Sequence, residues 1–149
     1  SCQEAASSAG LPGTYRAWLS AGSSTPGTRF SNTAGAGPYV KVSRRGNNGG
    51  PQAGPLVANS FAELLACPGG TCQAAPISDT EAGQVSQNSP VWTGTKSDGT
   101  VSPDTCNGWT NDAGQGLIGN TNLVNASWTD NGTNACSESR PIFCFQQAT

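Results

Sequence analysis

The sequence predicts one small, turn-rich domain in which short helices and short strands are held together by disulfide bonds. A length of 149 residues is typical of a single domain covering residues 1–149. The chain contains six Cys and no His, so disulfides explain its cysteines better than a zinc site does. Gly, Ser, Thr and Asn are abundant, whereas Leu, Ile, Val and Phe together make up less than about 20% of the residues. We therefore expect a modest apolar core surrounded by many turns.

Charge and cysteine content limit the location and the partners of the protein. Only 11% of the residues are charged and the net charge is −2, so the chain lacks the self-repulsion of disordered proteins. It also lacks the positive field that attracts nucleic acid, which we do not expect as a partner. No segment is long and apolar enough to span a bilayer, so membrane insertion is not expected either. The cysteines favour an oxidising, extracellular or cell-surface location.

The chain begins with signals for a helix and then for a strand. Residues 1–4, Ser-Cys-Gln-Glu, have the form of a capping box, which predicts a helix through about Ala9. Gly10 and the following Pro-Gly pair stop it. Residues 14–20 then alternate as a strand does, with Trp18 on the face opposite Tyr15, Ala17 and Leu19. Because both faces carry apolar groups, we expect both to be at least partly covered.

The next segment is mostly loop. Residues 21–38 are largely Gly, Ser, Thr, Ala and Pro, which favours irregular structure. Residues 39–42 form a short strand candidate, and residues 47–50 form a turn cluster of Asn and Gly.

A second helix is predicted after a second capping box. Residues 60–63, Ser-Phe-Ala-Glu, repeat the capping-box form, and Phe61, Leu64 and Leu65 share one helical face. The helix ends near Cys67 and Pro68, where the spacing to Cys72 allows a small disulfide loop to pin its end.

The last part of the chain holds two further strand candidates. Residues 90–94 read as a strand that runs into a Gly turn, and residues 97–100 carry an Asp-Gly turn signal. Residues 142–145, Ile-Phe-Cys-Phe, read as the final strand. There are no internal repeats and no linker, so one domain remains the prediction.

Motifs at both ends resemble a known family. Residues 2–6 and 10–20 resemble the start of the endostatin domain of collagens and of a related bacterial family of C-type-lectin-like surface proteins. The family's order continues with residues 91–94, 98–99, 106–109, 136 and 142–144, while the middle of the chain matches less well. The resemblance implies an α+β, C-type-lectin-like domain. It would have two short helices, small and mostly antiparallel sheets, neighbouring termini and long loops on one side.

The resemblance also implies a disulfide pattern. Six cysteines allow about 15 connectivities, and the sequence alone does not choose among them. In the family one disulfide ties the terminal helix to the terminal strand and a second is nested inside it. Carried over to this chain, these are Cys2 with Cys144 and Cys106 with Cys136, and Cys67 with Cys72 would be an addition. A bridge that joins the two ends is worth about 4 to 5 kcal/mol in the chain-entropy model.

The residue content argues against catalysis. Without His, the chain cannot build a Ser-His-Asp or Cys-His arrangement. A glycosidase needs only two carboxylates, so it remains an alternative. No carboxylate stands in a motif that predicts convergence, and we interpret them as solvated or turn-capping groups: Asp79, Glu81, Asp98, Asp104, Asp112, Asp130 and Glu138. A non-enzymatic domain is therefore the expectation.

Two oxygen-rich loops raise the question of calcium, which many C-type lectins use to bind sugars. These loops lie at residues 110–112 and 130–131, beside Trp109 and Trp128. Calcium requires about six or more oxygen ligands, and the family's sugar-binding tripeptides are missing. Asx turns in polar loops explain the pattern better. We therefore expect no cofactor and keep calcium as the alternative.

The tryptophans suggest where a ligand would bind. Trp18 and Trp92 lie in predicted strands and are expected to pack in the core, whereas Trp109 and Trp128 lie in loops where a ring could stack on a sugar or a partner. The candidate ligand-binding residues are Trp109, Asn111, Trp128, Asp130 and Asn131. The function expected is extracellular recognition or adhesion that binds a glycan or a surface protein. The alternative is a self-associating structural module, because low charge favours association.

Overall fold

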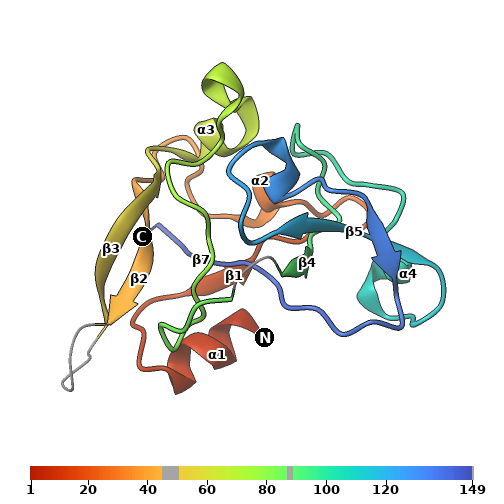
Figure 1. Ribbon diagram of the computed structural model, residues 1–149, viewed down its shortest axis with the longest axis horizontal. Coiled ribbons are helices and arrows are strands. Elements are labelled where there is room, and N and C mark those ends of the chain that lie inside the picture. Colours follow the sequence, from red (N-terminus) through yellow and green to blue (C-terminus); the bar gives the residue numbers. More distant parts are fainter. Residues whose placement is uncertain (45–50, 87–88, 149) are drawn as a thin grey trace.

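The computed structural model describes residues 1–44, 51–86 and 89–148 and contains short helices and three small sheets (Figure 1). The helices are α1 (Cys2–Ser8), α2 (Pro26–Arg29), α3 (Phe61–Ala66) and α4 (Cys106–Trp109), with 3₁₀ turns at Pro68–Gly70 and Ala126–Trp128. The strands are β1 (Tyr15–Ala17), β2 (Tyr39–Arg44), β3 (Pro51–Ala58), β4 (Pro90–Trp92), β5 (Gln115–Asn120), β6 (Thr133–Ala135) and β7 (Cys144–Gln146). The expected α+β class with small antiparallel sheets is confirmed.

The sheets bring distant parts of the chain together. Strand β1 pairs antiparallel with β7, so that Tyr15 lies opposite Gln146. Strands β2 and β3 form a second, separate pair, and β4, β5 and β6 form a three-stranded sheet with β5 in the centre. A parallel bridge between Trp92 and Ile142 connects β4 to the segment just before β7. The first and last strands are therefore paired with each other, and the segment before β7 is also joined to the three-stranded sheet.

Both helices predicted from capping boxes are present. The Ser1 hydroxyl accepts a hydrogen bond from the Glu4 amide, and the Ser60 hydroxyl accepts one from the Glu63 amide, each at 3.3 Å. The Glu63 carboxylate accepts from the Asn59 amide at 2.9 Å, one residue earlier than a capping box requires. Local hydrogen bonding of this kind lets neighbours in the sequence specify where a helix starts.

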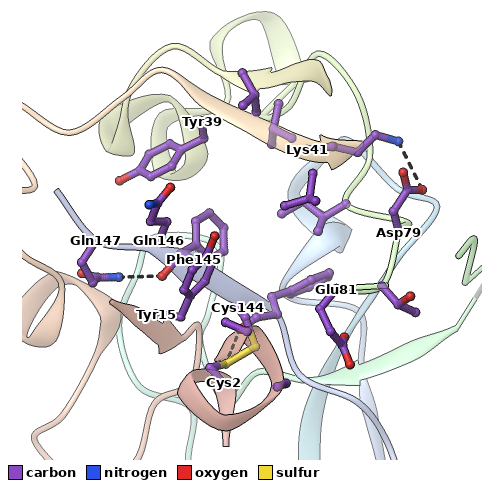
Figure 2. A pocket seen from close by; sticks show the side chains of 18 of the residues that line it. Cys2, Tyr15, Tyr39, Lys41, Asp79, Glu81, Cys144, Phe145, Gln146 and Gln147 are labelled. Carbon is purple, nitrogen blue, oxygen red and sulfur yellow. Dashed lines mark hydrogen bonds and ion pairs between the residues drawn. A yellow bond between two sulfur atoms is a disulfide. The ribbon is translucent and has the colours of Figure 1, made fainter. Parts of the chain in front are cut away.

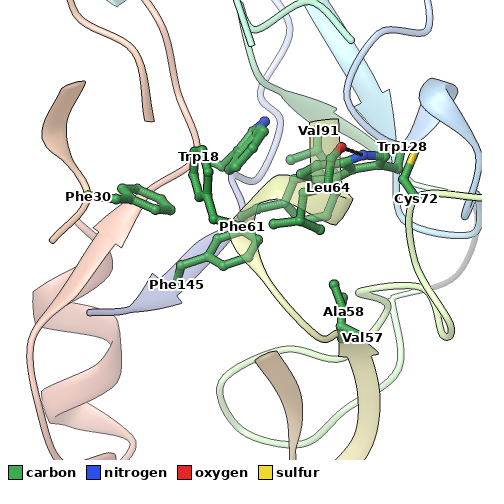
Figure 3. Close-up of a cluster of buried hydrophobic side chains, with 11 residues drawn as sticks. Trp18, Phe30, Val57, Ala58, Phe61, Leu64, Cys72, Val91, Trp128 and Phe145 are labelled. Carbon is green, nitrogen blue, oxygen red and sulfur yellow. Dashed lines mark hydrogen bonds between the residues drawn. The ribbon is translucent and has the colours of Figure 1, made fainter. Parts of the chain in front are cut away.

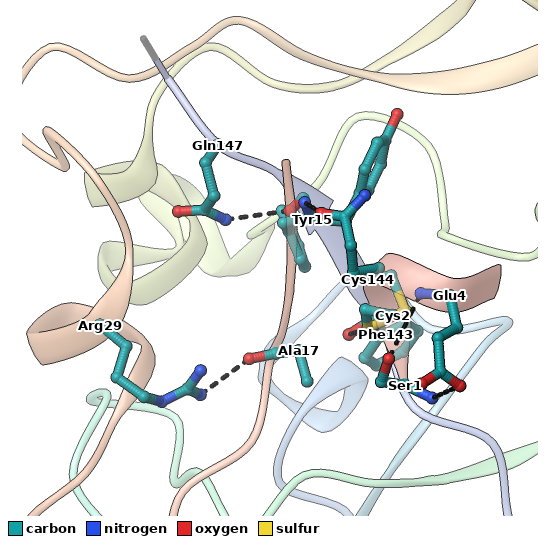
Figure 4. Close-up of a disulfide and its surroundings, with 11 residues drawn as sticks. Ser1, Cys2, Glu4, Tyr15, Ala17, Arg29, Phe143, Cys144 and Gln147 are labelled. Carbon is teal, nitrogen blue, oxygen red and sulfur yellow. Dashed lines mark hydrogen bonds and ion pairs between the residues drawn. A yellow bond between two sulfur atoms is a disulfide. The ribbon is translucent and has the colours of Figure 1, made fainter. Parts of the chain in front are cut away.

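The cysteines form the three disulfides that were expected. Cys2 bonds to Cys144 (Figure 4), Cys106 to Cys136 and Cys67 to Cys72. The first joins α1 to β7 with Cα atoms 5.5 Å apart, so the two ends of the domain meet. Three disulfides indicate an oxidising environment. No helix in the described part of the chain is long and apolar enough to cross a membrane.

Aromatic rings dominate the core (Figure 3). Trp18 is fully buried, as expected, and packs against Trp128, Phe61 and Phe145 with ring centroids 4.7 to 5.7 Å apart. Each fully buried ring of this kind removes a large apolar area from water, which a chain with few aliphatic residues needs. The core thus consists of a few large rings from the segment after β1, the end of α2, α3, the Ala126–Trp128 turn and the chain at β7.

The structure corrects several sequence predictions. The supposed loop at residues 21–38 contains α2, whose Thr25 cap and Thr28 form a reciprocal capping box. Strand β1 is shorter than residues 14–20, β2 extends to residue 44, and the last strand lies at 144–146 instead of 142–145. Strands β3, β5 and β6 were missed because Gly, Pro and Asn interrupt their alternation. The predicted turn cluster at residues 47–50 lies outside the described residues.

Candidate functional site: a groove beside strand β2

Trp128, one of the predicted ligand-binding residues, is part of the core. Its side chain is 0% exposed, and its ring centroid lies 4.7 Å from that of Trp18. Its indole N–H donates to the Leu64 carbonyl at 3.4 Å (Figure 3). A ring without exposed surface cannot stack on an external ligand. The expectation for Trp128 is wrong, because the Ala126–Trp128 turn directs this side chain inward.

Trp109 is half-buried at the surface. Cys106, Asn107, Gly108 and Trp109 all have positive φ, so α4 is one left-handed turn. This turn directs the indole N–H to the Ser20 carbonyl at 3.0 Å and packs the ring against Trp92 at 5.5 Å. Trp109 also borders a shallow hollow of about 180 Å³. Part of its surface is thus available to a partner. The rest of the ring contacts Trp92 of β4 and Ser20 in the segment after β1.

The other predicted binding residues do not converge. The Asn111 side chain accepts from the Ala113 amide at 2.9 Å, which makes the Asx turn that the sequence favoured. The Asp130 carboxylate accepts from the Ser97 amide at 3.2 Å, and Asn131 is exposed. Within the described part of the chain, no hydrogen bond or ring contact joins any two of the five predicted residues. Nor do the described residues contain a group of three or more His, Cys, Asp or Glu side chains suited to a metal ion.

A larger hollow lies elsewhere, beside β2. This groove has a volume of about 570 Å³ and is bordered by β2, by residues 77–81 and by β7, with α1 at its base (Figure 2). Its size is within the range of ligand sites, about 300 to 1,000 Å³. Sequence analysis missed it because its walls come from four segments that are far apart in the chain.

The floor of the groove is apolar and rigidly held. Ala6, Val57, Val91, Phe143 and Phe145 line it and are all buried. The Cys2–Cys144 disulfide also lines the groove and ties α1 to β7 (Figure 2). A covalently fixed floor holds the groove in shape before a ligand arrives, which lowers the entropy lost on binding.

Two tyrosines give the groove phenol groups. Tyr39 stands edge-on to the Phe145 ring at 5.4 Å, and Tyr15 lies on β1. Burial raises the pKa of both phenols above the usual value, so both remain protonated at neutral pH. Among the described residues neither hydroxyl has a hydrogen-bond partner. Both are therefore available to bond to a ligand.

One end of the groove is polar. The Lys41 ammonium lies 3.6 Å from the Asp79 carboxylate and donates to the Ser78 hydroxyl at 3.4 Å, and Ser78 donates to Asp79 at 3.3 Å (Figure 2). Glu81 lines the same end, and these three are the charged side chains of the described lining. This end of the groove therefore offers charged and hydroxyl groups that can orient a ligand.

No protein-family model, no curated protein and no solved structure matches this chain. Its function is therefore inferred from the groove itself.

Proposed function

We propose that this chain is an extracellular, non-enzymatic recognition domain of C-type-lectin-like fold that binds a glycan or a protein in the groove beside β2. One observation carries the proposal: a hollow of about 570 Å³ combines a buried apolar floor with two phenols and a charged end. Such a combination is typical of binding sites, where apolar walls supply affinity and a few polar groups supply orientation.

The disulfides support the location and the fold in this proposal. Three disulfides suit a protein that works outside the cell. Two of them, Cys2–Cys144 and Cys106–Cys136, are the pairs implied by the resemblance to endostatin and to bacterial C-type-lectin-like surface proteins. The absence of His from the sequence supports a binding role over nucleophilic catalysis.

A binding experiment with two matched variants tests the proposal. Ala53 and Ala62 are both exposed, but only Ala53 lines the groove, whereas Ala62 lies on α3. The oxidised domain is screened against a glycan array and against surface-protein extracts. Ala53→Gln places a longer side chain at the groove and is expected to weaken binding about tenfold, while Ala62→Gln leaves it unchanged.

A third variant separates the groove from the loop site. Trp109→Ala removes the half-buried ring of the predicted loop site. If Trp109→Ala abolishes binding in a folded protein and Ala53→Gln does not, the groove is not the site. If the wild-type domain binds neither a glycan nor a protein, the recognition function itself is wrong.

The structure gives the glycosidase alternative one supporting feature, since Asp79 and Glu81 both line the groove. Asp79, however, forms an ion pair with Lys41 and accepts a hydrogen bond from Ser78. A carboxylate held in this way suits a ligand-binding contact better than a catalytic acid or base. We expect no hydrolysis of oligosaccharides by the wild-type domain. Hydrolysis that disappears in Glu81→Gln would establish the enzyme instead.

The self-association alternative is supported by Val40 and Val85. These are the large apolar side chains most open to water in the described part of the chain, 43% and 63% exposed. Light scattering at micromolar concentration distinguishes this alternative, because a self-associating module forms dimers or trimers there. We expect a monomer.

A further inference from the structure

Two arginines meet at the hollow beside Trp109, and neither forms an ion pair with a described residue. The exposed Arg16 of β1 donates to the backbone carbonyl of Arg29, the last residue of α2. The half-buried Arg29 lines the hollow, and its guanidinium donates to the Ala17 carbonyl at 2.8 Å (Figure 4). It also donates to the Leu19 carbonyl at 2.6 Å. Two like charges therefore lie close together without a carboxylate.

An anion would relieve the electrostatic cost of this arrangement. Burial, and then the charge of Arg16, lower the pKa of Arg29 below its usual value. A guanidinium nevertheless stays charged at neutral pH, so the pair does not relieve its repulsion by losing a proton. Both hydrogen bonds of the Arg29 side chain leave from Nη2, so Nε and Nη1 have no partner in the described part of the chain. A carboxylate binds a guanidinium through two such N–H groups at once.

The hollow combines this charge with an apolar surface and a hydroxyl. Trp109 and Leu19 supply apolar surface, and Ser24 supplies a hydroxyl that has no hydrogen-bond partner among the described residues. The volume of about 180 Å³ is smaller than the 300 to 1,000 Å³ of sites that enclose a whole ligand. The hollow is therefore suited to a single residue of a larger molecule.

The backbone around the hollow offers little to a peptide. The carbonyls of Leu19 and Ser20 already accept hydrogen bonds from the guanidinium and the indole of the hollow. The backbone amides and carbonyls of Ala21 and Ser24 bond to each other. A peptide that docks as an added strand bonds to free main-chain groups. A ligand in this hollow depends on side chains instead, which is the way a sugar is bound.

We propose that the hollow binds one carboxylated pyranose, a uronic or sialic acid residue of a glycan. Its carboxylate would bond to Arg29, the apolar face of its ring would lie against Trp109, and a ring hydroxyl would bond to Ser24. A polyanion is not expected, because two cations on a chain of net charge −2 give only a local positive field. This site shares no residue with the groove beside β2 and goes beyond the function proposed for that groove.

NMR titration tests the site, with the tryptophan indole N–H signals as internal markers. The methyl glycosides of glucuronic acid and of N-acetylneuraminic acid are each added to the oxidised domain up to about 10 mM. One or both are expected to move the Trp109 signal with a Kd on the order of 1 mM, and the fully buried Trp128 is expected to keep its signal. The glycoside that moves the Trp109 signal identifies the source of the carboxylate.

Three further compounds separate the carboxylate from the ring. The methyl ester of the glucuronoside keeps the ring without the charge, and acetate keeps the charge without the ring. Each is expected to bind about tenfold more weakly than the acidic sugar, or worse. If either binds as tightly as the acidic sugar, recognition of a carboxylated pyranose is wrong. If the capped tripeptide Gly-Glu-Gly moves the Trp109 signal and the sugars do not, the partner is a protein and the proposal is wrong.

Protein variants place the sugar in the hollow. Arg29→Lys keeps the charge but loses the planar pair of donors, and it is expected to weaken binding about tenfold. Because Arg29 also bonds to two carbonyls, Arg16→Gln and Ser24→Ala provide tests that leave these bonds in place, and each is expected to weaken binding about threefold. Lys96→Gln removes an exposed cation that does not line the hollow and is expected to leave binding unchanged.

The outcomes separate this site from the groove beside β2. If acidic sugars are weakened by Ala53→Gln but not by Arg16→Gln or Ser24→Ala, they bind in the groove, so this inference is wrong and the proposed function stands. If neither glycoside moves the Trp109 signal, the hollow is not a sugar site, whatever the groove binds. If Arg16→Gln and Ser24→Ala weaken an acidic sugar and no ligand is sensitive to Ala53→Gln, the hollow is the recognition site and the function proposed for the groove is wrong.

Discussion

The Trp18 indole N–H donates a hydrogen bond of 2.8 Å to the Thr129 hydroxyl, and both side chains are fully buried. The Thr129 hydroxyl in turn donates to the Thr95 carbonyl at 2.8 Å. The Thr95 hydroxyl lies 2.7 Å from that of Ser20. This chain of buried hydroxyls joins the segment after β1 to the loops that hold Thr95 and Thr129. It lets a polar sequence fill its interior without leaving these groups unpaired.

Replacing Thr129 by Val is expected to destabilise the domain by about 2 to 4 kcal/mol. The change keeps the shape but leaves the Trp18 N–H and the Thr95 carbonyl without this partner, and each buried unsatisfied group costs about 1 to 3 kcal/mol. Urea denaturation measures the loss. Thr129→Ser retains the hydroxyl and serves as the control. Equal stability of wild type and Thr129→Val would show that the network contributes little.

The three disulfides are expected to stabilise the domain in the order of their loop lengths. The chain-entropy model gives about 5 kcal/mol for Cys2–Cys144, about 3.6 for Cys106–Cys136 and about 2 for Cys67–Cys72. Their sequence separations are 142, 30 and 5. Each pair is replaced by two serines and the free energy of unfolding is compared. A smaller loss for the terminal pair than for Cys67–Cys72 would contradict the entropic explanation.

Gly119 allows the backbone of β5 to approach Trp128 closely, and Gly119→Ala is expected to cost about 2 kcal/mol or more. A Cβ at this position would overlap the Trp128 carbonyl oxygen. Gly27 in α2 has no positive φ, and a Cβ there would meet the Thr25 hydroxyl oxygen at 3.7 Å, an ordinary contact, so Gly27→Ala serves as the control and should be neutral or stabilising. Thermal denaturation of both variants, compared with the wild type, measures this difference in stability. Equal melting temperatures would mean that β5 and Trp128 can separate without loss.

Acid is expected to weaken the turn at residues 97–100. The hydrogen bond from the Thr100 hydroxyl, and then that from the Thr100 amide, lower the pKa of the Asp98 carboxyl below its usual value. A lowered pKa in the folded state contributes stability above the unfolded value of about 3.9, and this contribution is lost as the pH falls through the folded pKa. NMR titration of the Asp98 carboxyl carbon checks this. A midpoint at or above about 3.9 would contradict it.

Asp98→Asn provides the matched comparison. The amide oxygen can still accept from Thr100, but it does not titrate in this range. The protection of the Thr100 amide from hydrogen exchange, relative to its intrinsic rate at each pH, should therefore fall in acid for the wild type and stay level for Asp98→Asn.

Local signals in the sequence were sufficient for the elements that local hydrogen bonds specify. The caps at Ser1 and Ser60 and the turn at Asp98-Gly99 each use neighbours within a few residues, and the structure has all three. Gly99 has a φ of +88°, a conformation that glycine adopts without strain. The cysteine content and the absence of His likewise indicated a disulfide-linked domain without a His-dependent catalytic site.

Long-range contacts decided where the side chains of the candidate sites lie. Trp109 and Trp128 look alike in the sequence, since both follow Gly- and Asn-rich stretches, yet only Trp109 reaches the surface. Trp128 packs against Trp18 from a distant part of the chain, and Gly119 lets the backbone at Trp128 approach β5 closely.

The sequence by itself determined the class of molecule: a weakly charged, disulfide-linked domain with two capped helices. Only the tertiary structure decided which tryptophan is buried, which strand is central and where the groove lies. The reason is physical. A capped helix needs neighbours in sequence, whereas the groove beside β2 exists because β2, β7, α1 and residues 77–81 meet in space.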